Sequence, residues 1–120
     1  MQALVIDDSR AMRKILGRIL TDIGYQVREA ENGSAALEVL NEGATPHLAL
    51  VDWNMPVMNG YEFVCKVRED ARWNDLRLMM VTTETGETEV TRALDAGANE
   101  YVMKPFTKDV IVQKLKLMGL

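Results

Sequence analysis

The sequence has one cysteine, Cys65, in 120 residues, so the chain cannot form an internal disulfide. This scarcity is typical of a reducing compartment, and the helical pattern around Cys65 predicts a buried, inert thiol. The single histidine, His47, lies in a connecting region, where we expect a solvated side chain. No apolar run approaches the roughly 18 residues of a membrane span. Because Asp7 and Asp8 interrupt the only early apolar run, we expect no secretory signal, and we expect a cytoplasmic protein without membrane insertion.

An excess of positive charge is also missing. The chain has 14 Lys and Arg against 18 Asp and Glu, a net charge of -4, which gives no basic surface for nucleic acid. Hydrophobic residues make up 48% of the chain, which excludes intrinsic disorder. A chain of this length forms one domain, here residues 1–120, and buries roughly two-thirds of its surface without needing a metal or a disulfide.

What the sequence does contain is a regular alternation of two patterns. Short apolar runs predict strands at 3–6, 25–30, 48–51, 76–81 and 101–103. Apolar residues at helical spacing predict a helix after each strand, with Arg10, Arg13, Lys14 and Arg18 on the polar face of the first. The segment 70–75 has no apolar pattern and is expected to be a polar connection. Strict alternation predicts an α/β fold, a doubly wound parallel sheet with helices on both faces.

The expected topology is flavodoxin-like, a (βα)5 fold with strand order 2-1-3-4-5. This order is taken from known five-stranded doubly wound folds and is not worked out from these residues. In such a sheet, the first and third strands are neighbours at the point where the winding reverses, and ligands bind there beyond the carboxyl ends of the strands.

Polar residues follow four of the five expected strands. Asp7 and Asp8 follow the first strand, and Asp52 ends the third, in a run that is apolar enough to be buried on both faces. Thr82 ends the fourth strand and Lys104 the fifth. Each residue alone is explained by a helix cap, a turn or a solvated charge. Five such residues at one edge of one sheet indicate a shared pocket instead.

The charges in this pocket favour a particular chemistry. Two carboxylates about 5.5 Å apart repel by about 3 kcal/mol at an effective dielectric constant near 20, and a divalent cation relieves this. Oxygen ligands with room for water suit Mg²⁺, with Mn²⁺ as an alternative. A carboxylate such as Asp52 can attack phosphorus and form an aspartyl phosphate. The ammonium of Lys104 and the hydroxyl of Thr82 would then stabilise the transferring phosphoryl group.

These motifs together resemble the receiver domain of two-component response regulators over the whole chain. The resemblance rests on Asp7-Asp8, Asp52-Trp53-Asn54-Met55-Pro56, Thr82 and Lys104-Pro105-Phe106. Within that family, the chain is most similar to the single-domain chemotaxis regulators. This narrower similarity rests on Trp53-Asn54, Glu84, Tyr101 and the absence of anything beyond the fifth helix.

The resemblance implies a role for each matching residue. Asp52 is the expected phosphoacceptor, and Asp8, Asp52 and the main-chain carbonyl of Asn54 are the expected direct ligands of Mg²⁺. Asp7 is expected to act mainly through water. Lys104 would pair with the phosphoryl group, and its bond to Pro105 is expected to be cis.

Further roles concern signalling and hydrolysis. Thr82 and Tyr101 are the expected switch pair, while Asn54 and Glu84 are expected to tune hydrolysis of the acyl phosphate. Thr83 departs from the family pattern, which often has Ala or Gly there, and is expected to restrict access to Asp52 or to alter coupling to Tyr101.

The resemblance also implies a function and partners. A sensor histidine kinase would donate the phosphoryl group, and the protein would remove it by its own slow hydrolysis, without turnover of an external substrate. The phosphorylated form would bind its target, such as a flagellar motor switch protein, through the fourth helix, fifth strand and fifth helix. A phosphatase is a further expected partner, and the protein is expected to be a monomer.

Several alternatives stay open on the residues alone. The chain could be a receiver cut from a larger regulator, or a stand-alone receiver outside chemotaxis. A phosphatase of the haloacid-dehalogenase type also uses an Asp nucleophile, but it needs a second Asp where this chain has Asn54. A flavin or nucleotide binder of the same fold needs a phosphate-binding loop after the first strand, where Asp7 and Asp8 would repel phosphate.

Overall fold

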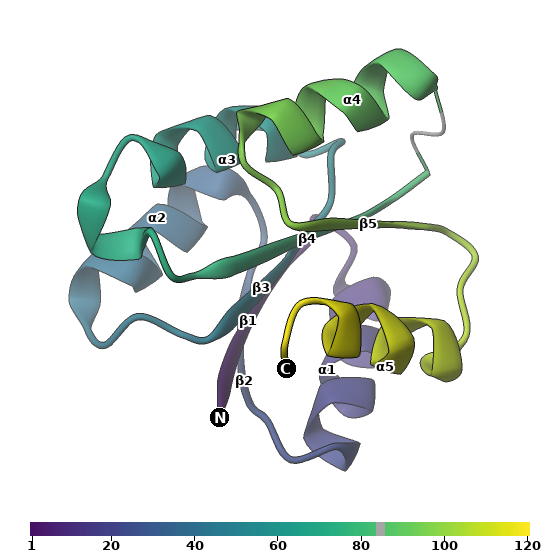
Figure 1. Ribbon diagram of the computed structural model, residues 1–120. Helices are drawn as coiled ribbons and strands as arrows, with labels where there is room; N and C mark the ends of the chain where they lie inside the picture. Colours follow the sequence, from purple (N-terminus) through teal and green to yellow (C-terminus); the bar gives the residue numbers. More distant parts are fainter. Residues whose placement is uncertain (84–85) are drawn as a thin grey trace.

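The computed structural model describes residues 1–83 and 86–120 and contains the five strands and five helices that the patterns predict (Figure 1). In chain order the elements are β1 (Gln2–Ile6), α1 (Arg10–Asp22), β2 (Gln26–Ala30), α2 (Gly33–Glu42), β3 (Leu48–Val51), α3 (Gly60–Arg68), the 3-10 helix η1 (Ala71–Trp73), β4 (Arg77–Thr82), α4 (Glu87–Ala96), β5 (Glu100–Met103) and α5 (Lys108–Leu117). All strand pairs are parallel, and the strand order β2-β1-β3-β4-β5 confirms the expected topology.

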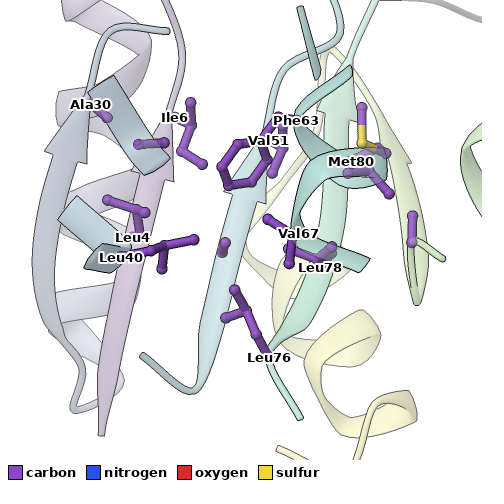
Figure 2. Packing of buried hydrophobic residues seen from close by; sticks show 14 of the residues in the cluster. Leu4, Ile6, Ala30, Leu40, Val51, Phe63, Val67, Leu76, Leu78 and Met80 are labelled. Atoms are coloured by element: carbon purple, nitrogen blue, oxygen red, sulfur yellow. The ribbon is translucent and has the colours of Figure 1, made fainter. Parts of the chain in front are cut away.

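The helices divide between the two faces of the sheet. Helices α1 and α5 cover one face, and α2, α3 and α4 cover the other (Figure 1). Successive residues of β1 alternate between the two cores, with Leu4 and Ile6 on the α2–α4 side and Ala3 and Val5 on the α1–α5 side. Figure 2 shows the α2–α4 core, where the Phe63 ring of α3 packs over the sheet. All four residues of β3 are buried, as its continuous apolar run predicts.

Local capping residues start four of the helices. The side chains of Ser9, Asn32, Asn59 and Thr107 each accept a hydrogen bond from a backbone N–H in the first turn of the helix that follows. Asn59 does so within a complete capping box. Gly97, with φ of 120°, ends α4 in a conformation that residues with a side chain rarely adopt. None of the helices that the structure describes has the length and hydropathy that a membrane crossing requires.

Two expectations about α3 and the segment that follows it were wrong. The segment 70–75 is not simply a polar connection, since it contains η1 and the Trp73 side chain is only 5% exposed. Arg68 anchors the segment, because its guanidinium donates to the carbonyls of Trp73 (2.9 Å) and Leu76 (2.7 Å). Cys65 is partly exposed instead of buried, because it lies at the edge of the face that α3 turns toward the sheet.

Candidate functional site

The predicted polar residues meet at the carboxyl ends of the strands, as the topology requires. Hydrogen bonds continue past the ends of the strands and hold the backbone in place. The N–H of Asp7 donates to Ala30 (3.1 Å), that of Asp52 to Ile6 (3.0 Å) and that of Lys104 to Thr82 (2.9 Å). The functional side chains therefore extend from a rigid sheet edge and not from free loops.

Three carboxylates form a tight group in this pocket. Asp7, Asp8 and Asp52 each offer an oxygen, and the three oxygens lie within 4.8 Å of one another. Asp7 is 1% exposed and Asp52 is 7% exposed, whereas Asp8 is open to solvent. This donor set fits Mg²⁺, because the ligand atoms are all oxygen and the exposed side leaves room for the waters that Mg²⁺ retains.

Lys104 is the cation of the pocket. Its Nζ lies 2.8 Å from Oδ2 of Asp7 and 3.6 Å from Oδ2 of Asp52, and its side chain is only 14% exposed. The N–H of Ser9 donates to the other oxygen of Asp7 at 2.9 Å. In this structure Lys104 therefore offsets the charge of two carboxylates of the pocket.

Burial raises the pKa of Asp52 above its ordinary value. Hydrogen bonds from the Thr82 hydroxyl and the Asn54 backbone, together with the positive charge of Lys104, oppose this rise in pKa, and the negative charge of Asp7 adds to it. The net result is a carboxylate that is costly to keep ionised in the metal-free protein.

The loop after Asp52 is closely packed against the next helix. A Cβ at Gly60 would lie 2.1 Å from the Asp52 carbonyl oxygen, so only glycine fits there. The Gly60 N–H also donates to the Trp53 carbonyl at 2.9 Å. Between Trp53 and Gly60 the chain makes a γ-turn centred on Val57, in which the Met58 N–H donates to the Pro56 carbonyl at 2.7 Å. The φ of Val57 is 69°, which is a strained conformation for a β-branched residue.

Sequence reasoning missed a residue that supports the pocket. Arg13 was assigned to the polar face of the first helix, but its side chain is only 14% exposed. Its Nη1 donates to the Asp7 carbonyl at 2.6 Å, and its Nε donates to Glu29 at 3.0 Å. The helical pattern gave no signal for this contact, because the long side chain reaches back from α1 to the end of β1.

The remaining predicted residues are distributed around the pocket. Thr82 is fully buried, and Tyr101, which is 9% exposed, extends from the neighbouring strand β5 into the α2–α4 core. Asn54 and Thr83 are exposed beside Asp52 and Thr82. The Lys104-Pro105 peptide bond is cis, as the resemblance implied. Glu84 lies outside the described residues.

Comparison with known proteins decides the family. Residues 3–116 match the model of the response regulator receiver domain. The chain belongs to the response regulator receiver family. As a receiver, it is 46% identical to chemotaxis protein CheY1 of Helicobacter pylori, over 98% of this chain and 96% of that protein. It is also 46% identical to the chemotaxis protein CheY homolog of Campylobacter jejuni, over 97% of this chain and 90% of that protein.

Solved structures of receivers have the same fold. Chemotaxis response regulator CheY4 of Vibrio cholerae matches with a TM-score of 0.90 and 32% identity, over 98% of this chain and 97% of that one. A putative response regulator from Chloroflexus aurantiacus also matches with a TM-score of 0.90, at 28% identity over 98% and 95% of the two chains. Chemotaxis regulators of this type are a known example of the strand order found here.

Membership of the receiver family supports a phosphorylation-activated switch of the chemotaxis type. Mg²⁺ binding and an aspartyl phosphate are typical of receivers, and the three-carboxylate group supplies suitable ligands in this chain. The match also decides against the phosphatase and flavin-binding alternatives, because it covers almost the whole chain.

Proposed function

We propose that residues 1–120 form one receiver domain that accepts a phosphoryl group on Asp52 from the phosphohistidine of a sensor kinase. The observation that supports this most directly is the placement of Lys104 beside the three clustered carboxylates. An oxygen of Asp52 attacks phosphorus, the P–N bond to the histidine breaks, and the imidazole leaves with the electron pair of that bond. Hydrolysis later transfers the phosphoryl group to water and restores the Asp52 carboxylate.

Each residue of the pocket has a part in this transfer. Asp8, Asp52 and the Asn54 carbonyl would hold Mg²⁺ directly, and Asp7 would do so through water. When bound there, Mg²⁺, or Mn²⁺ in its place, would supply positive charge that offsets the charge of the phosphoryl oxygens. Lys104 turns from the carboxylates to the incoming phosphoryl group. The Nζ of Lys104 can reach that group, because it already lies 3.6 Å from Oδ2 of Asp52. The Asn54 side chain and Glu84 adjust the rate at which the acyl phosphate is hydrolysed.

The signal leaves the pocket through Thr82 and Tyr101. The Thr82 hydroxyl already donates to Asp52, and phosphorylation adds acceptor oxygens near it. A stronger bond to Thr82 favours the inward position of the Tyr101 ring within a pre-existing equilibrium. A bias of about 1.5–3 kcal/mol shifts the populations by roughly ten- to a hundredfold. Thr83, beside this pair, limits access to Asp52 or modifies the coupling.

The output surface is an apolar groove between α4, β5 and α5. Leu94, Met103 and Val110 line it and remain 42%, 52% and 36% exposed. They are exposed because they face the groove and not the sheet. The Glu100–Lys114 pair, at 3.1 Å, borders the same groove. Because the named relatives act in chemotaxis, a flagellar motor switch protein is the proposed target of a monomeric, cytoplasmic receiver, and a phosphatase is a second partner.

Labelling with a small phosphodonor tests this function. With Mg²⁺ and acetyl phosphate, the wild-type protein should gain one phosphoryl group that hydroxylamine removes, as expected for an acyl phosphate. Asp52→Asn should abolish labelling, whereas Asp75→Asn, which changes an exposed acid outside the pocket, should leave it intact. Labelling of Asp52→Asn at the wild-type level, with no transfer to a Ser or Thr, would exclude Asp52 as the acceptor.

A further inference from the structure

Three side chains from different elements stack beside the phosphoacceptor. Trp53 follows Asp52 in the β3–α3 loop, Tyr61 lies in the first turn of α3, and Arg92 lies on α4, the neighbouring helix on that face of the sheet (Figure 1). The Trp53 and Tyr61 ring centroids are 5.6 Å apart, with an interplanar angle of 33°. The guanidinium carbon of Arg92 lies 4.4 Å from the Tyr61 centroid and 6.0 Å from the Trp53 centroid.

Among the described residues, the contacts of the Arg92 guanidinium are with aromatic rings and not with a carboxylate. Glu89 and Asp95 are each three residues away on the same helix, but no ion pair among the described residues includes Arg92. A planar guanidinium is attracted to the faces of aromatic rings, which a compact ammonium matches less well. Arg92 therefore links α4 to the other two elements through a contact that depends on its own side-chain type.

The two sides of this link differ in how firmly they are held. Tyr61 directly follows Gly60, which is packed against the Asp52 carbonyl and hydrogen-bonded to Trp53, so both rings extend from backbone that is held close to Asp52. Within the described part of the chain, no side chain caps the start of helix α4, whose N-cap is Gly86. The other four α-helices each have a side-chain cap. A shift of α4 relative to the loop therefore has to break the Arg92 contacts.

We propose that Arg92 is a positioning residue that couples α4 to the phosphoacceptor loop. This inference depends on the proposed function, since it concerns how a change at Asp52 reaches the output groove. The change displaces the loop that carries Trp53, the Arg92 guanidinium follows the rings, and α4 moves with its groove residues Val90 and Leu94. A cation–π contact at an exposed site changes an equilibrium constant by a factor of about two to five, which is enough to bias a small helix displacement.

The test uses the whole chain with three variants. Arg92→Ala removes the contact, and Arg92→Lys keeps the charge without the planar group. Arg18→Ala is the matched control, because Arg18 is exposed on α1 and forms no ion pair among the described residues. Fluorotryptophan labelling gives separate ¹⁹F signals for Trp53 and Trp73, and Trp73 is the internal reference. Hydrogen exchange of the α4 amides is measured with and without beryllofluoride and Mg²⁺.

In the free protein, Arg92→Ala should shift the Trp53 signal, leave the Trp73 signal in place, and speed α4 exchange by about two- to fivefold. On addition of beryllofluoride and Mg²⁺, the change in α4 hydrogen exchange should be less than about half of the change in wild type, since the same contact energy is lost. Arg92→Lys should recover part of both effects, and Arg18→Ala should match wild type throughout.

Three results would overturn the proposal. If α4 of free Arg92→Ala exchanges like that of Arg18→Ala, the link between α4 and the loop does not exist. If α4 of Arg92→Ala exchanges faster but responds to beryllofluoride as wild type does, Arg92 is only structural. If wild-type α4 and Trp53 do not respond to beryllofluoride and Mg²⁺, the proposed function fails, and the coupling of α4 to Asp52 fails with it. The comparison of free Arg92→Ala with free Arg18→Ala still decides whether Arg92 links α4 to the loop.

Discussion

Removing one carboxylate of the pocket should stabilise the metal-free protein, and Asp8→Ala is the cleanest change. Asp8 is exposed, and the Ser9 side chain caps α1, so the substitution neither opens a cavity nor removes a cap. The acidic oxygens of Asp7, Asp8 and Asp52 lie within 4.8 Å of one another, so Asp8 repels two neighbours at close range.

The size of the effect follows from that distance. Two charges at 4.8 Å repel by about 3.5 kcal/mol at a dielectric constant of 20 and by about 0.9 kcal/mol in water. Because Asp8 is exposed and Lys104 offsets part of the charge, the lower figure applies to each of its two pairs. We therefore expect Asp8→Ala to raise the free energy of unfolding in EDTA by about 1–2 kcal/mol.

Urea melts in EDTA measure this difference, with Asp75→Ala as the control for loss of an exposed acid outside the pocket. Mg²⁺ should reverse the order of stability, because it stabilises the wild-type protein by binding and Asp8→Ala binds it weakly.

The raised pKa of Asp52 sets the pH dependence of this difference in stability. Because the folded pKa of Asp52 is raised, this residue stabilises the folded protein fully below its unfolded pKa, and the stabilisation is lost as pH rises through its folded pKa. In acid Asp52 is protonated and no longer repels Asp8. The stability advantage of Asp8→Ala over wild type should therefore shrink as the pH falls. If Asp8→Ala is less stable than both wild type and Asp75→Ala in EDTA at neutral pH, the electrostatic reasoning is wrong.

Three further substitutions test other parts of the structure. Thr82→Ala should still accept a phosphoryl group on Asp52 but lose most of the gain in partner affinity that beryllofluoride causes in wild type, and an equal gain in both proteins would remove Thr82 from the mechanism. Arg13→Ala should weaken Mg²⁺ binding, measured by calorimetry, and destabilise the fold by about 1.5–3 kcal/mol, because it removes the donor to the Asp7 carbonyl; unchanged values would show that this contact is incidental. Val57→Gly should stabilise the protein by about 1 kcal/mol in urea melts, since it relieves the strain of a positive φ at a β-branched residue, and a loss of stability would contradict the γ-turn.

Much of the pocket could be predicted because its residues are tied to strand ends. An apolar run followed by a polar residue is a local pattern, and parallel topology brings all the carboxyl ends to one edge of the sheet. Asp7, Asp52, Thr82 and Lys104 could be grouped from these patterns together with the strand order of known five-stranded folds. The helix starts were predictable for the same reason, since the side chains of Ser9 and Thr107 bond to backbone only three residues away.

Long side chains were the part that the sequence alone could not place. Helical spacing put Arg13 on a polar outer face, yet the end of β1 and Glu29 of β2 lie close enough for it to bond to both. Trp73 lies in a polar segment and is buried because Arg68 holds that segment against the protein. In both cases, the arginine side chain reaches a backbone carbonyl outside its own helix, and helical spacing does not indicate that contact.

The link between Arg92 and the rings of Trp53 and Tyr61 has the same origin. The sequence determined the strand ends, the caps and the alternation of elements, because each depends on residues within a few positions of one another. Only the packing of α3 against α4 brought the guanidinium of Arg92 on α4 over the rings of Trp53 in the β3–α3 loop and Tyr61 on α3. No periodicity in the chain encodes that contact, since it depends on how two neighbouring helices pack on the same face of the sheet.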